Sequence, residues 1–193
     1  ILATGCADGL VRLWLAKNGL SYVTTLQQPE PPGKGTSAVR TLAFSSDGAT
    51  LACGTLITRL WLWDVASGQL RCDPKKEHTE VITALAFTPD SKTLVSSSVD
   101  RSVRLWDAMS GQPRGEPIRQ KGEVWAVRVS RDGRLIAASV GFVGVRLWDV
   151  ATGEPYGGLI PHDSRVNDLA FSPDGRRLVT ASSDRTARIW DLQ

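Results

Sequence analysis

Residues 145–149 spell Val-Arg-Leu-Trp-Asp, and close relatives of this phrase recur along the 193-residue chain. Each relative contains one of five tryptophans: Trp14, Trp63, Trp106, Trp148 and Trp190. An aspartate follows four of them, and Leu15 follows the first. Successive tryptophans in this series stand 49, 43, 42 and 42 residues apart. A nearly fixed period in this range predicts a chain built of structural repeats.

A second phrase marks a turn inside each unit. Phe-Ser-Pro-Asp-Gly occupies residues 171–175, and its relatives occupy residues 44–48, 87–91 and 129–133. Alternating apolar runs flank each copy, and Asp-Gly between such runs predicts a hairpin because glycine accepts positive φ. No window of twelve or more residues carries the apolar stripe of a helix. The sequence therefore predicts an all-β chain.

The composition is that of a folded, soluble protein, with 41% hydrophobic and 22% charged residues. The formal net charge is only +3. Arginines recur at one position of the repeat, at Arg12, Arg104, Arg146 and Arg188. This regular placement favours a structural role for them over a nucleic-acid-binding patch, so nucleic acid is not the expected partner.

The cysteines Cys6, Cys53 and Cys72 are odd in number and show no metal-binding spacing. Thiols in a reducing compartment fit this usage best, so we expect a cytoplasmic protein without metal or cofactor. No apolar run approaches the roughly 18 residues of a membrane span, and no signal-peptide pattern opens the sequence.

Together these phrases resemble the WD40 repeat family from end to end. The resemblance implies a β-propeller, in which four-stranded antiparallel blades, lettered a to d from centre to rim, surround a channel. It divides the chain into one domain, 1–193, with repeats at about 1–27, 38–77, 78–120, 121–161 and 162–193. Residues 27–37 are expected to form a Pro/Gly-rich loop insertion, and a partner-contacting flap is the alternative.

The first of these five blades would lack strand a, and the last would lack strand d. Blades with uncovered edges are poor solutions in water. Family members commonly have seven blades, so we expect a segment of a longer, seven-bladed ring. A closed ring of five blades and the assembly of fragments into a larger ring are the alternatives.

The resemblance also implies a buried, hydrogen-bonded tetrad of histidine, serine or threonine, aspartate and tryptophan. Complete tetrads are expected at His78, Ser96, Asp100 and Trp106, and at His162, Thr180, Asp184 and Trp190, both with intervals of 18, 4 and 6 residues. A partial one is expected at Thr4, Asp8 and Trp14. These residue types also occur in hydrolase triads, but repetition and the lack of a Gly-x-Ser-x-Gly elbow favour a structural role. No catalytic residues are expected.

Two repeats depart from the tetrad pattern. Their equivalent positions hold Gly35, Cys53, Ile57 and Trp63 in the second, and Gln120, Ala138, Phe142 and Trp148 in the fourth. We expect apolar packing to hold these blades together and their loops to be looser. Trp61 lies two residues before Trp63, so it shares a strand face with Trp63 and is expected to be buried.

The second residue of strand a tends to lie at the mouth of a propeller channel, on the face with the d–a and b–c loops, here called the top face. These positions hold Arg40, Thr83, Trp125 and Asn167. Tryptophan and arginine are enriched among binding hot spots, so we expect a partner-binding surface there. An alternative is that Trp125 fills the space left by the missing tetrad.

The expected function is that of a non-catalytic scaffold or sensor platform that binds a protein or peptide on the top face. The repeat wording resembles bacterial-type WD40 proteins, in which propellers are often attached to ATPase, protease or kinase domains. The partner is therefore another protein or another domain of the same longer chain. Nucleic-acid binding and a purely structural role in a large assembly are the alternatives.

Overall fold

A computed structural model of the chain describes residues 1–16, 21–28, 38–72 and 75–192. This part consists of antiparallel strands and turns and contains no helix, and so no helix able to cross a membrane. The strands are β1 (Leu2–Gly5), β2 (Leu10–Leu15), β3 (Ser21–Gln27), β4 (Val39–Phe44), β5 (Thr50–Thr55), β6 (Leu60–Asp64), β7 (Ile82–Phe87), β8 (Thr93–Ser98), β9 (Ser102–Asp107), β10 (Pro113–Arg119), β11 (Val124–Val129), β12 (Leu135–Val140), β13 (Gly144–Asp149), β14 (Pro155–Pro161), β15 (Val166–Phe171), β16 (Arg177–Ser182) and β17 (Ala187–Asp191).

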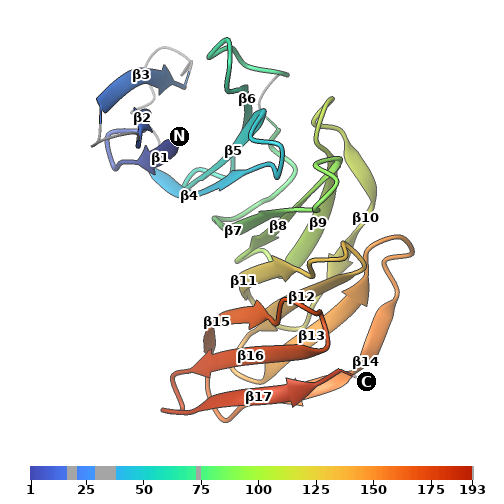
Figure 1. The fold of residues 1–193 in the computed structure, drawn as a ribbon. Coiled ribbons are helices and arrows are strands. Elements are labelled where there is room, and N and C mark those ends of the chain that lie inside the picture. Colours follow the sequence, from blue (N-terminus) through green and yellow to red (C-terminus); the bar gives the residue numbers. More distant parts are fainter. Residues whose placement is uncertain (17–20, 29–37, 73–74, 193) are drawn as a thin grey trace.

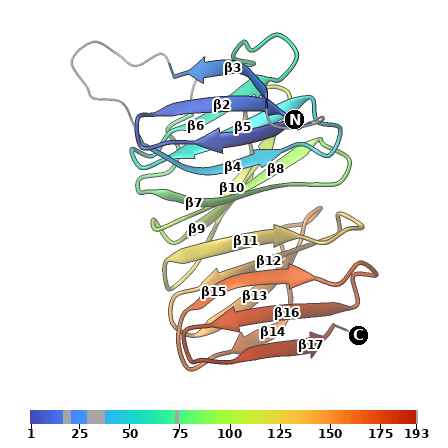
Figure 2. The same cartoon turned by 60° about the vertical axis from the view of Figure 1, so that its left-hand side comes forward.

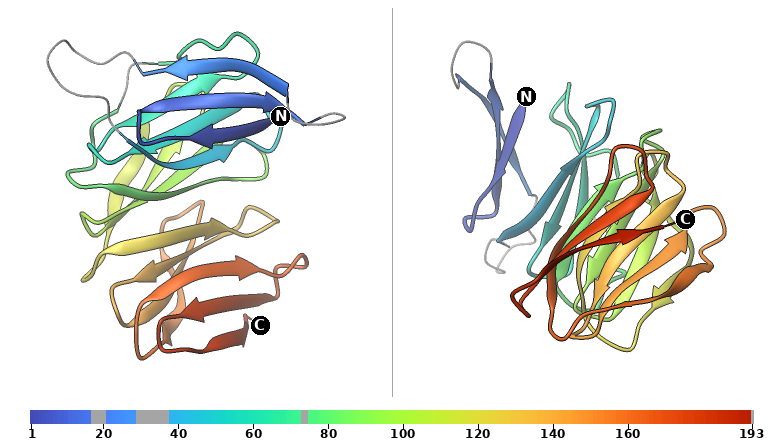
Figure 3. Two further views of the ribbon diagram at one scale, coloured as in Figure 1. Left: turned by 90° about the vertical axis from the view of Figure 1, so that its left-hand side faces the viewer. Right: turned by 60° about the horizontal axis from the view of Figure 1, so that its bottom comes forward.

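The strands form five separate sheets that follow the order of the repeats. Their members are β1–β3, β4–β6, β7–β10, β11–β14 and β15–β17, and each strand pairs with its neighbours in the sequence. The sheets succeed one another along an arc in Figure 1 and are stacked in Figure 3. The innermost strands β4, β7, β11 and β15 contact one another in turn and come forward in Figure 2. In the described residues the arc is not a closed ring. The prediction of an all-β, propeller-like array of blades is confirmed.

The second sheet differs from its prediction. The resemblance implies four strands in this blade, but in the described residues the segment after Asp64 meets the sheet through isolated bridges, from Leu60 to Lys75 and from Trp63 to Leu70. In the part of the chain that the structure describes, this sheet therefore has three strands where the next two have four.

The a–b turns repeat one local design. In the second repeat the hydroxyl of Ser45 donates to Asp47 Oδ1 at 2.5 Å, and the same carboxylate oxygen accepts the backbone N–H of Ala49 at 3.0 Å. These hydrogen bonds hold the pKa of Asp47 below its usual value. Gly48 follows with φ of 71°, the left-handed conformation that the Asp-Gly phrase predicts. The phrase therefore recurs because the same turn must be made in every unit.

The apolar core lies between the sheets, as four clusters at the four contacts between successive sheets. In the contact between the third and fourth sheets, Val95 and Val103 pack against Val124, Ile136 and Trp148. The other three contacts are built in the same way, from apolar residues of two neighbouring sheets. Each sheet is thus held by its neighbours rather than by a core of its own.

Trp61 and Trp63 occupy the contact between the first and second sheets. Trp61 is fully buried, as predicted from its spacing, and its ring is stacked 6.5 Å from that of Trp63, centroid to centroid. Both rings belong to the cluster that also contains Val11 and Leu13 of β2. Apolar packing therefore fills the position where the other repeats place an arginine.

Gly144, at the start of β13, gives a direct test of the packing between β13 and β14. Its φ is 137°, and a Cβ at this position would lie 1.9 Å from the carbonyl oxygen of Ile160. We expect Gly144→Ala to lower the free energy of unfolding by about 4 kcal/mol, measured by urea denaturation. Gly157 is the matched control, because its φ is also positive, 68°, but its Cβ would meet nothing within 4 Å. Gly157→Ala is expected to cost only about 1–2 kcal/mol, and equal losses in the two variants would contradict the argument.

Candidate functional site

The third repeat contains a continuous chain of four hydrogen-bonded side chains. Asp100 Oδ2 lies 2.7 Å from His78 Nδ1, and His78 Nε2 lies 2.7 Å from Ser96 Oγ. The indole N–H of Trp106 donates to the same Ser96 oxygen at 2.8 Å. With the proton on Nδ1, His78 donates to Asp100 and accepts from the Ser96 hydroxyl, so each of these polar groups has a partner.

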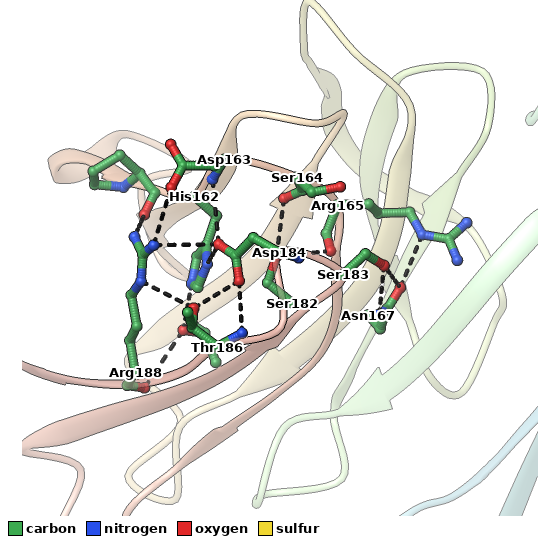
Figure 4. A network of polar contacts seen from close by, with 12 residues as sticks. His162, Asp163, Ser164, Arg165, Asn167, Ser182, Ser183, Asp184, Thr186 and Arg188 are labelled. Carbon is green, nitrogen blue, oxygen red and sulfur yellow. Dashed lines mark hydrogen bonds and ion pairs between the residues drawn. The ribbon is translucent and has the colours of Figure 1, made fainter.

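The fifth repeat reproduces this geometry. His162 lies 2.8 Å from Asp184 and 2.7 Å from Thr180, and Trp190 donates to Thr180 Oγ1 at 2.9 Å. Figure 4 shows that the network extends to Arg188, which donates to the carbonyl of Pro161 and to the carboxylates of Asp163 and Asp184. The two sets of sequence intervals therefore correspond to two equivalent three-dimensional arrangements.

The first repeat contains a partial tetrad, at Thr4, Asp8 and Trp14. Trp14 donates to Thr4 Oγ1 at 2.9 Å. Asp8 accepts from the backbone N–H of Leu10 and forms an ion pair with Arg12 at 2.8 Å. The ion pair thus ties the b–c turn to strand c without a histidine.

The second and fourth repeats lack the hydrogen-bonded tetrad. Gly35 lies outside the described residues. In the second repeat Cys53 is buried, which raises the pKa of its thiol to about 12, and the indole N–H groups of Trp61 and Trp63 have no hydrogen-bond partner in the described residues. In the fourth, Ala138 is fully buried, and the side chain of Gln120 donates to the carbonyl of Arg119.

The tetrads fix loops rather than open onto a pocket. Ser96 and Thr180 are completely buried. Asp100 also accepts the backbone N–H of Thr79, so the chain joins the loop before β7 to the turn after β8. Burial raises the pKa of Asp100, but hydrogen bonds from His78 and Ser102 outweigh it and hold the pKa well below its ordinary value of 3.8. The carboxylate is therefore an ionised anchor for both loops.

Comparison with protein families gives three matches to one repeat model. The WD40 model, described as "WD domain, G-beta repeat", matches residues 23–64, 72–107 and 153–191, which together make up more than half of the chain. The chain belongs to the WD40 repeat family. WD40 repeats generally act in protein–protein scaffolding and are typically non-catalytic. A search of curated proteins finds no match to this chain.

The matched stretches leave out residues 108–152. This interval contains the part of the fourth WD40 repeat in which Gln120, Ala138 and Phe142 stand at tetrad positions. The second repeat also lacks the hydrogen-bond chain, but its residues up to Asp64 lie within the match to 23–64.

The four residues expected on the top face lie in different environments. Arg40 and Asn167 are exposed, and Trp125 is half-buried. Thr83 is buried, and its hydroxyl donates to the carbonyl of Val124 at 2.6 Å. The hydroxyl of Thr83 thus links the starts of β7 and β11, and its contact with a partner stays a prediction.

Arg165, which was not among the four predicted top-face residues, contacts two of them. The guanidinium of Arg165 lies 4.9 Å from the centroid of the Trp125 ring, in cation–π geometry. Its Nε donates to Asn167 Oδ1 at 2.9 Å, and Asn167 donates to Ser183 Oγ at 2.9 Å. We call Trp125, Arg165 and Asn167 the top-face cluster. Sequence spacing held one signal for Arg165: it stands two residues before Asn167, and such residues share a face of an extended segment.

No group of three or more His, Cys, Asp or Glu side chains with the geometry of a metal site occurs in residues 1–16, 21–28, 38–72 and 75–192.

Removal of the Ser96 hydroxyl tests the structural role of the tetrad. Ser96→Ala leaves both His78 Nε2 and the indole N–H of Trp106 buried without their partner. We expect the free energy of unfolding to fall by about 1–3 kcal/mol in chemical denaturation. Ser110→Ala removes an exposed hydroxyl and is expected to cost less than about 0.5 kcal/mol. Equal effects of the two substitutions would argue against a special role for the buried chain.

The depressed pKa of Asp100 predicts a pH dependence of stability. A carboxyl whose pKa is lower in the folded state stabilises the fold above its unfolded pKa and loses this contribution as the pH falls below it. We therefore expect part of the wild-type stability to disappear as the pH is lowered from 5 to below 3.8. Asp100→Asn is expected to be less stable than wild type at pH 7 and to lose less stability over this acid range, measured by urea denaturation. Glu80→Gln, at an exposed position, should keep the wild-type profile.

Proposed function

We propose that this chain is a non-catalytic platform that binds a protein or peptide on its top face, centred on the top-face cluster and Arg40. The observation that carries the proposal is the packing of Arg165 over Trp125, 4.9 Å from the ring centroid. It brings an arginine and a tryptophan from neighbouring sheets together at the loop edge. These two side chains are the ones most often found at the energetic centre of protein interfaces.

The cluster is held in place before any partner arrives. Arg165 is fixed by Asn167, and Asn167 is fixed by Ser183 in the next turn. The indole N–H of Trp125 is buried and has no hydrogen-bond partner in the described residues. Side chains ordered in advance lose less conformational entropy on binding, which favours affinity.

The b–c turns add apolar surface to the same face. The turn of the second repeat bonds to the segment before β4, through Leu56 N and the carbonyl of Ala38, and the fourth-repeat turn bonds to the segment before β11, through Gly141 N and the carbonyl of Glu123. Both turns expose apolar side chains, with Ile57 40% and Phe142 67% exposed. Exposed aromatic and aliphatic groups beside arginines support a peptide as the ligand rather than a nucleic acid.

The proposal includes a partner that is either a separate protein or another domain of a longer chain. It also includes a cytoplasmic location, for which the usage of Cys6 and Cys53 as thiols is the supporting observation.

Replacement of the aromatic and cationic groups tests the proposal. Peptides selected from a random library against the wild-type chain should lose binding to the Arg40→Ala/Trp125→Ala double variant, with an increase in Kd of about 30-fold or more by fluorescence anisotropy. Arg165→Ala should weaken the same peptides. Met109→Ala is the control, because Met109 is exposed in a c–d turn at the opposite face.

The variants should keep the wild-type circular dichroism spectrum and melting temperature to within a few degrees. Selected peptides that bind the double variant as tightly as the wild type would overturn the top-face proposal.

A further inference from the structure

The structure has a second open surface, away from the top-face cluster. A groove of about 940 Å³ lies between β10 of the third sheet and the face of the fourth sheet formed by β13 and β14. Its volume is within the range of about 300–1,000 Å³ found for ligand sites. Both β10 and β14 lie on the outer side of the arc in Figure 1. No part of the proposed function uses this groove.

The groove lies where the fourth repeat lacks its hydrogen-bond chain. Gln120, at the histidine position, lines the groove and bonds to the adjacent backbone instead of reaching into the sheet. Phe142, at the aspartate position, points into solvent and is 67% exposed. The side chains at the histidine and aspartate positions therefore form no hydrogen-bond chain here.

The arginine of the fourth repeat is available to a ligand. In the first repeat Arg12 pairs with Asp8, and in the fifth Arg188 pairs with Asp163 and Asp184, whereas Arg104 of the third repeat has a buried Nε without a partner in the described residues. Arg146 stands at the same repeat position, is exposed, and has no ion-pair or hydrogen-bond partner among the described residues. An unpaired guanidinium at the wall of a groove offers five donors to a carboxylate ligand.

The tryptophan of this repeat provides a second unused donor. Trp148 is only 2% exposed and lines the groove, and no described residue accepts a hydrogen bond from its indole N–H. In the third and fifth repeats the equivalent N–H groups donate to Ser96 and Thr180. The Trp148 nitrogen is not one of the fully buried, unpartnered atoms, so it is accessible from the groove, where a ligand carbonyl can accept its hydrogen bond.

The remaining lining sets the character of the ligand. Arg119 and Lys121 add positive charge beside Arg146, and Glu116 is the one carboxylate of the described lining. Val143 and Leu159 add apolar surface, and they are 52% and 40% exposed. A ligand complementary to this wall carries carboxylates, backbone carbonyls and aliphatic side chains together.

We propose that this groove binds an extended peptide segment in which acidic and aliphatic residues alternate, with Arg146 pairing to its carboxylates and Trp148 donating to its backbone. Alternation follows from the extended conformation, in which successive side chains point to opposite sides. The segment comes from a partner protein, and the site is separate from the top-face cluster.

The test measures fluorescence anisotropy of a fluorescein-labelled octapeptide of alternating glutamate and leucine, titrated with the 193-residue chain. Two comparison probes alternate lysine with leucine and glutamate with serine. We expect saturable binding of the Glu-Leu peptide and much weaker binding of both comparison probes. Binding of the Glu-Leu peptide should weaken as salt is raised, because solvent ions screen exposed ion pairs.

Two substitutions probe the two chemistries of the groove. Arg146→Glu should raise the Kd of the Glu-Leu peptide by about tenfold or more, and Leu159→Asn should also raise it. The matched control is Arg131→Glu, an exposed arginine in the a–b turn of the same repeat, which should change the Kd by less than about twofold. Arg146 is exposed, so its replacement is expected to leave the melting temperature unchanged.

The proposal is overturned by the absence of saturable binding, by equal binding of the Lys-Leu or Glu-Ser probe, or by an Arg146→Glu variant that binds like wild type. The Arg40→Ala/Trp125→Ala variant should bind the Glu-Leu peptide normally. A result in which only that variant, and not Arg146→Glu, loses the peptide assigns the binding to the top face and likewise overturns the groove.

Discussion

Apolar packing between successive sheets is the interaction on which the rest of this structure depends. No sheet has a buried interior of its own, and each of the four clusters draws residues from two neighbours. The repeated tryptophan is useful in this setting because one residue supplies a large apolar surface to such a contact. Its polar N–H group then sets a second requirement, which the hydroxyl of Ser96 or Thr180 meets in the complete tetrads.

Much of the fold could be predicted from the sequence because the same local problems recur in every repeat. Trp125 was expected as the second residue of an inner strand, and β11 spans Val124–Val129. The pairs His78–Ser96 and His162–Thr180 could be anticipated because a hydrogen-bond chain demands particular residue types at a constant spacing. Such patterns are visible wherever one repeat can be compared with another.

The remainder depends on contacts between repeats, which no single repeat contains. Thr83 holds the same register as Arg40 and Trp125, yet its hydroxyl bonds to the neighbouring inner strand and is buried. Arg165, just before β15, reaches Trp125 of the neighbouring sheet. The groove beside Arg146 likewise arises from the spacing between β10 and the fourth sheet. Sequence periodicity specifies each sheet well but carries little information on how far apart two sheets stand.

The uneven distribution of the polar chains has a consequence for the dynamics of the array. In a linear array of units, local opening is governed by the stability of each unit and of its immediate contacts. Loops clamped by Asp100 and Asp184 should exchange their amide hydrogens slowly, whereas the turns at Ile57 and Phe142 have no such carboxylate clamp. We therefore expect stiffer and more compliant blades to alternate along the arc, with adjustment to a bound partner concentrated in the compliant blades.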